Sequence, residues 1–121
     1  MPSERRQIIL SAEETVHAVE AYRRVRPELL PRGPILGFRL DAPEAAGGAP
    51  ALLVRVEMAY GRTHQAAEVR AEEADLLELL VRCCLENNIP IPRGGSKRAA
   101  LIDGALALVI DYAGEDLPGG G

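Results

Sequence analysis

The segment from Pro92 to Arg98 carries the residues best suited to binding chemistry. Its sequence, Pro-Arg-Gly-Gly-Ser-Lys-Arg, sets two glycines and a hydroxyl among three cations. Flexible glycine backbone and clustered cations together can hold a small anion. The segment is not a phosphate-binding P-loop, because the Gly-Lys-Ser/Thr order is missing. The sequence therefore gives a candidate anion or nucleic-acid site, with a solvated linker as the alternative, and its residues are Arg93, Ser96, Lys97 and Arg98.

Residues for metal binding or catalysis do not form a recognisable set. His17 and His64 are the two histidines, whereas lasting zinc sites usually draw three or four His and Cys ligands. Ser11 and Ser96 fit a Ser-His-Asp triad only on paper, because neither lies in a strand-to-helix nucleophile elbow. We therefore expect no metal, no cofactor and no enzymatic activity.

Cys83 and Cys84 are adjacent in the chain. Neighbouring side chains on a helix diverge by about 100°, so a mutual disulfide would need strained geometry. We interpret both as reduced thiols that pack as small hydrophobic side chains.

The charge balance argues against a general binder of polyanions. The chain carries 14 basic and 18 acidic residues, a formal net charge of −4, whereas nucleic-acid affinity rests on cations that neutralise phosphates. A local basic patch remains open, with Arg23, Arg24 and Arg26 as candidate contributors. No stretch approaches the roughly 20 apolar residues of a membrane span, and the apolar start is too short for a signal peptide. We expect a soluble, cytoplasmic protein.

The first third predicts a short strand followed by a helix. Arg6 to Leu10 is expected to form the strand, and Ser11 with Glu14 has the spacing of a capping box that opens the helix. Pro27 ends this helix near Arg26. The expected apolar stripe is Val16, Val19, Tyr22 and Val25. Residues 28–34, rich in proline, predict a rigid turn.

Period-two alternation predicts three strands in the middle of the chain, over residues 36–40, 52–60 and 63–70. Residues 42–50 contain prolines and glycines and predict a mobile hairpin loop between the first two strands. The pair Gly61-Arg62 suits a two-residue turn, which fixes a register. This register sets Tyr60 opposite Thr63 and Arg55 opposite Glu68.

The second helix, predicted from Glu72 to Asn87, has an unusually wide apolar surface. Its polar residues fall in one narrow row, which leaves an apolar arc of about 240° against the roughly 100° of an ordinary surface helix. One sheet face cannot bury that arc. Part of it must meet the first helix and the last hairpin, or another protein.

A two-residue Asp-Gly turn predicts a final hairpin around Asp103 and Gly104. Its second strand, Ala105 to Tyr112, is apolar on both faces, which indicates a central strand or one covered by a partner. The apolar arc and this strand together give a predicted interface. Its residues are Leu77, Leu80, Val81, Cys84, Ala107 and Val109.

The elements in order give β-α-β-β-β-α-β-β, an α+β fold with both helices packed on an antiparallel sheet. Residues 1–113 are expected to form one domain and residues 114–121 a disordered Gly-rich tail. The closing Gly-Gly is interpreted as part of that tail.

Two resemblances accompany this pattern. Residues 12–87 are similar in element order to double-stranded-RNA-binding domains, which hold phosphates with a basic cluster at the start of the last helix. Here that position carries Glu72, Glu73 and Asp75, so the resemblance implies the topology without the activity. The stretch from Cys84 to Arg93, continuing to Lys97 and the strand 105–110, resembles a pattern in small uncharacterised bacterial proteins, which implies no particular activity.

The sequence thus predicts a non-enzymatic protein-interaction module that forms a homodimer. The alternative is anion or nucleic-acid binding through the basic loop 93–98.

Overall fold

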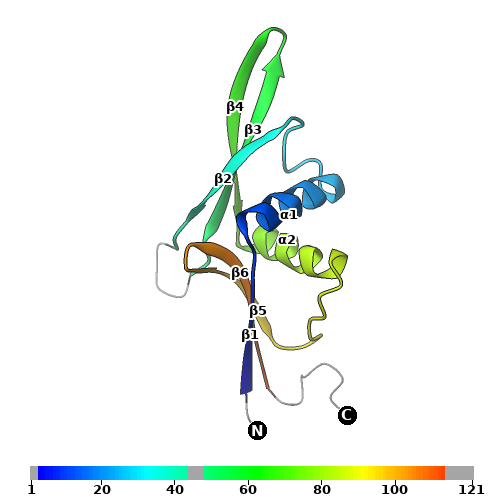
Figure 1. Ribbon diagram of the computed structural model, residues 1–121, viewed down its shortest axis with the longest axis vertical. Helices are drawn as coiled ribbons and strands as arrows, with labels where there is room; N and C mark the ends of the chain where they lie inside the picture. Colours follow the sequence, from blue (N-terminus) through cyan, green and yellow to red (C-terminus); the bar gives the residue numbers. More distant parts are fainter. Residues whose placement is uncertain (1–2, 44–47, 114–121) are drawn as a thin grey trace.

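The computed structural model describes residues 3–43 and 48–113, and these form six strands and two helices in the predicted order (Figure 1). The elements are β1 (Ser3–Ile9), α1 (Ala12–Val25), β2 (Ile35–Asp41), β3 (Ala51–Tyr60), β4 (Thr63–Glu72), α2 (Glu73–Glu86), β5 (Ser96–Ile102) and β6 (Ala105–Ala113). The predicted tail over 114–121, and part of the predicted loop over 42–50, lie outside the described residues.

The strands divide between two antiparallel sheets. The terminal sheet has the order β1-β6-β5, and the middle sheet has the order β2-β3-β4. The α+β class and the element order are as predicted, but the strands form two antiparallel sheets and not the single sheet expected. β6 pairs with β1 on one side and β5 on the other, so of the two predicted alternatives, a central strand or one covered by a partner, the first is the one observed.

The two-residue turn after β3 sets the register of the β3–β4 hairpin as predicted. Tyr60 lies opposite Thr63 and Arg55 opposite Glu68. The Glu68 carboxylate, however, accepts hydrogen bonds from the Arg39 guanidinium of β2, at 3.0 and 3.2 Å. The turn therefore predicts how β3 and β4 align. It does not predict that Glu68 binds Arg39, because Arg39 belongs to the third strand, β2.

The capping box of α1 is present. The Glu14 amide donates to Ser11 Oγ at 3.1 Å, and the Ser11 amide donates to the Glu14 carboxylate at 2.9 Å. The hydrogen bond from the Ser11 backbone amide to the carboxylate, helped by the Ser11 side chain, lowers the pKa of Glu14.

The predicted apolar stripe of α1 is only half correct. The buried row is Thr15, Ala18, Val19 and Tyr22, at the i, i+3, i+4, i+7 spacing of one helix face. A strict three-residue step instead drifts around the helix, so Val25 is exposed.

One core is shared by both helices and both sheets. It contains Leu76, Leu79, Leu80 and Cys84 from α2, side chains of α1, and residues of β3, β5 and β6. Both helices lie to one side of the strands, with α2 between α1 and the terminal sheet (Figure 1). Neither described helix is long and apolar enough to cross a membrane.

The β3–β4 hairpin extends beyond its sheet. β2 pairs with β3 only as far as Val56, opposite Ile35, and beyond that point the two remaining strands project as an arm (Figure 1). Residues 63–66 on the arm are exposed on both faces. At its base the Glu57 amide donates to the Pro34 carbonyl at 2.9 Å, which ties the arm to the loop before β2.

Candidate functional site

Most of the predicted interface lies inside the protein. Leu80 and Ala107 are fully buried, and Cys84 and Val109 are 1% exposed. These four side chains are therefore not available to a partner, and the prediction is corrected for them. α1 and the terminal sheet together cover the part of the α2 arc that a single sheet could not, and β6 has a strand on each side.

The part of the apolar arc of α2 that keeps solvent exposure is a row of three side chains. These are Leu77, Val81 and Leu85, which we call the α2 stripe. Leu77 and Val81 are half-buried against the core, and Leu85 is 62% exposed, the most exposed of the large hydrophobic residues described. A spacing of four residues aligns these side chains along one face of a helix. Leu77 and Val81 belong to the interface predicted from the sequence, and Leu85 does not.

Three of the four described sheet edges carry features that discourage pairing with another chain. β1 has charged residues at its start, β2 has a register irregularity near Gly37, and β4 has alternating charges. Charges and bulges are the usual protection of an edge strand. β5 carries charge only at its start, at Lys97 and Arg98, and it is the least protected of the four edges, because residues 99–102 are Ala-Ala-Leu-Ile, without charge, proline or register irregularity.

The predicted anion site does not converge on one point. Lys97 pairs with Ile110, which belongs to the core, and Arg98 pairs with Val109 on the opposite face of the sheet. Neighbouring residues on a strand point to opposite faces, so these two cations diverge. The Lys97 ammonium donates to the Gly94 carbonyl at 3.2 Å.

One glycine of this loop, Gly95, has a packing role. Gly95 has a φ of +87°, and a Cβ there would lie 2.8 Å from the Asp111 carbonyl oxygen and 2.9 Å from the Cβ of Tyr112. Because a side chain would collide there, Gly95 lets the loop pack tightly on β6. The presence of glycine at position 95 is therefore explained by packing, without a bound anion.

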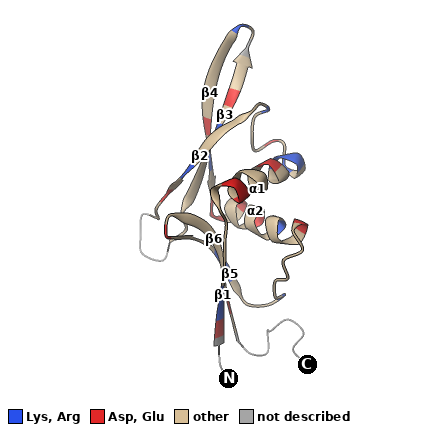
Figure 2. Ribbon diagram, in the orientation of Figure 1, with Lys and Arg blue, Asp and Glu red and all other residues tan. Residues whose placement is uncertain are grey.

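Two of the three arginines proposed to contribute to a basic patch already bond to other groups of the chain. Arg23 donates to the carbonyls of Pro31 and Gly33, and Arg26 forms ion pairs with Glu28 and Glu78. Figure 2 shows basic residues distributed over several elements beside acidic ones. Arg23 and Arg26 are thus bonded within the chain and not free to extend a basic patch from the loop.

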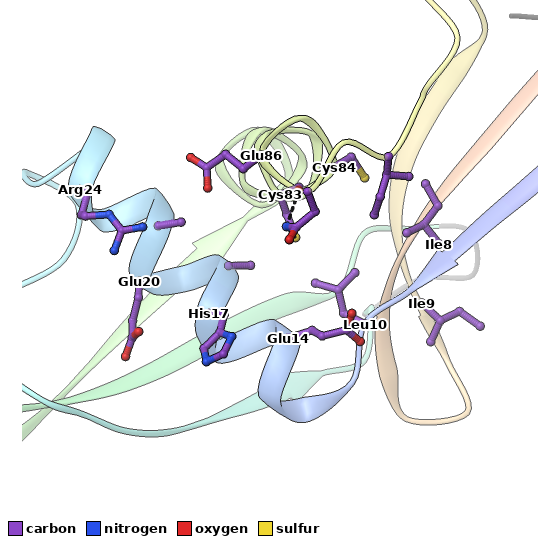
Figure 3. A pocket seen from close by; sticks show the side chains of 14 residues that line it. Ile8, Ile9, Leu10, Glu14, His17, Glu20, Arg24, Cys83, Cys84 and Glu86 are labelled. Atoms are coloured by element: carbon purple, nitrogen blue, oxygen red, sulfur yellow. Dashed lines mark hydrogen bonds between the residues drawn. The ribbon is translucent and has the colours of Figure 1, made fainter.

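A groove lies between α1 and the end of α2, and β1 closes it at one side. It holds about 500 Å³. Glu14, His17, Glu20 and Arg24 of α1 line it together with Cys83 and Glu86 of α2, and the side chains of His17 and Glu20 point away from α2 (Figure 3). The sequence analysis did not find this groove, because its walls come from segments about 70 residues apart. Among residues 3–43 and 48–113, no group of His, Cys, Asp and Glu is arranged to hold a metal ion.

The thiols in the groove are held in their protonated form. Burial raises the pKa of Cys83, the carboxylates of Glu14 and Glu86 raise it further, and a hydrogen bond from Asn87 opposes them. Burial also raises the pKa of Cys84. Because the thiolate is the nucleophile, neither side chain is activated at neutral pH.

We expect iodoacetamide to alkylate Cys83 in the folded protein more slowly than in the urea-unfolded chain at pH 8. A raised pKa leaves less thiolate at that pH, and the folded rate should climb only at more alkaline pH. Mass spectrometry of the labelled peptide would measure both rates. A folded rate equal to or above the unfolded one would show that the thiol is activated.

Comparison with protein-family models, curated proteins and solved structures found no match, so the function of this chain is argued from its own residues.

Proposed function

We propose that this protein is a non-enzymatic interaction module that acts as a homodimer. The observation that carries the proposal is the α2 stripe, which ends in a leucine that is 62% exposed. Covering a large aliphatic side chain is favourable by about 1.5–3 kcal/mol when the burial is complete. A protein surface is the natural cover for a row of aliphatic side chains that runs along a helix.

A protein partner fits these features better than an anion or a nucleic acid does. The stripe is aliphatic, whereas Lys97 and Arg98 point to opposite faces of β5. Arg23 and Arg26 already bond to groups within the chain. A nucleic acid needs several cations on one face to neutralise its phosphates, and the described residues do not provide that arrangement.

The groove between the helices supports a non-enzymatic assignment. Its thiols have raised pKa values, and its carboxylate Glu14 has a lowered pKa because it caps α1. An acid or base near neutrality would need the opposite shift in a carboxyl group. The two thiols and the Glu14 carboxyl group therefore have pKa shifts opposite to those that would suit them to nucleophilic or acid–base catalysis.

Light scattering coupled to size-exclusion chromatography tests the proposal. We expect a mass of twice the chain at high concentration, and we expect Leu85→Glu to shift the protein to the monomer at the same concentration. Leu36→Glu is the matched control, because Leu36 is also an exposed leucine, at 45%, but lies on β2. It should leave the dimer intact. A wild-type protein that stays monomeric at the highest concentration would refute the proposal.

A further inference from the structure

We infer that the two copies join by antiparallel pairing of β5 with β5, so that the terminal sheets fuse into one six-stranded sheet across a two-fold axis. This inference rests on the homodimer proposed above and specifies its surface. Two features on the same side of the protein carry it: the uncharged stretch 99–102 of the β5 edge, and the α2 stripe beside that edge. A single two-fold axis beside β5 covers both the β5 edge and the α2 stripe.

The β5 edge offers free backbone hydrogen-bonding groups at alternate residues. The turn Asp103-Gly104 sets Ile102 opposite Ala105, and the residues that flank a two-residue turn bond to each other. Bonded and non-bonded pairs then alternate along an antiparallel ladder. The backbone N–H and C=O of Lys97, Ala99 and Leu101 therefore point away from β6, toward any strand that lies alongside.

The α2 stripe lies on the side of its helix that faces away from α1. Cys83 faces α1 across the groove (Figure 3). Val81 is two residues earlier, a rotation of about 200° around the helix, and so lies on nearly the opposite side. The groove is closed by β1, and β5 is the opposite edge of the same sheet, so the side of α2 that faces away from the groove lies toward the β5 edge. Pairing at that edge sets the stripes of the two copies against each other.

Charge selects the register of the pairing. A two-fold axis at Lys97 or Arg98 would put like charges directly opposite each other, which is destabilising. With the axis at Ala100, Lys97 lies beside Asp103 of the second copy, and Arg98 lies opposite Ile102. The two copies of Arg98 are then about 14 Å apart along the strands, by the rise of about 3.4 Å per residue, which is beyond the screening length of about 8 Å at physiological salt. This register therefore adds an opposite-charge pair at each end.

Cysteine cross-linking tests the register directly. Ala100 is half-buried, and in the inferred dimer it meets its own copy as a non-bonded pair with Cα atoms about 4.5 Å apart, within reach of a disulfide. We expect Ala100→Cys to give a covalent dimer on a non-reducing gel after mild oxidation. Ala66→Cys is the control, since Ala66 is an exposed alanine on the edge strand β4. It and the wild type, with its native thiols, should remain monomeric on that gel.

A second variant tests the edge independently. Leu101→Pro removes an N–H that β6 does not use, and proline is tolerated on an edge strand at such a position. We expect it to yield a monomer in light scattering, with an unchanged far-ultraviolet circular dichroism spectrum. If this variant does not fold, the cross-link decides.

The outcomes separate the inference from the proposal on which it rests. A wild-type monomer at every concentration refutes the homodimer and the pairing with it. A wild-type dimer in which Ala100→Cys cross-links no better than Ala66→Cys overturns the β5 pairing and leaves the homodimer standing. A dimer that cross-links at residue 100 supports both.

Discussion

Replacing Leu80 with Ala should lower the free energy of unfolding by about 3 kcal/mol, within the roughly 2–5 kcal/mol range of buried Leu→Ala changes. Leu80 is fully buried and belongs to the core shared by both helices and both sheets. Removing its terminal carbons loses their transfer free energy and leaves a cavity that tight packing prevents from closing. Urea unfolding followed by circular dichroism measures the change.

Leu85→Ala provides the matched control on the same helix. Leu85 is 62% exposed, so at a concentration where the protein is monomeric this change should alter the free energy of unfolding by less than about 0.5 kcal/mol. Equal losses for the two variants would contradict the placement of Leu80 inside and Leu85 outside. The comparison thus tests which side of α2 is buried in the core and which side is exposed for the proposed interface.

Replacing Gly33 with Ala should destabilise the protein by roughly 3 kcal/mol, through backbone conformation and close approach together. Gly33 has a φ of +141°, which residues with a side chain rarely adopt, and an added Cβ would lie 2.0 Å from the Glu57 carbonyl oxygen. That contact is impossible, so the loop must move away from β3. The movement would strain the hydrogen bond from Glu57 to Pro34 that ties the loop to the arm.

Gly37→Ala is the appropriate comparison for Gly33→Ala. Gly37 has no atom within 4 Å of its added Cβ, and its φ is not in the positive region. Alanine there should be neutral or slightly stabilising, because glycine loses more conformational freedom in a strand. Thermal unfolding of both variants measures the difference. A Gly33→Ala variant as stable as Gly37→Ala would mean that the loop does not press on β3.

Local signals in the sequence accounted for most of the elements. Ser11 and Glu14 predicted the start of α1 because a capping box involves residues only three apart. The turn at Gly61 predicted the whole β3–β4 register, since a two-residue connection allows one alignment. The two apolar faces of β6 predicted a central strand or one covered by a partner. Each of these features depends on residues that are close in the sequence, or on the apolar pattern of a single strand.

Features that depend on distant segments were not predictable in the same way. Leu80 and Val81 are neighbours in one apolar arc, and only the positions of α1 and the terminal sheet decide which of them is covered. The basic loop was misjudged for a different reason. β5 begins at Ser96, earlier than the hairpin pattern indicated, and strand alternation then separates Lys97 from Arg98.

The pairing of β1 with β6 has a consequence for biosynthesis. The Arg5–Asp111 ion pair joins residues 106 positions apart, so β1 leaves the ribosome long before its neighbour has been translated. The β2–β3–β4 meander is complete within the chain by residue 72 and can form first. Contacts between such distant residues carry a high loop-closure entropy and slow folding. Until β6 emerges, the nascent chain holds an unpaired first strand, and this interval is when it most needs chaperone protection.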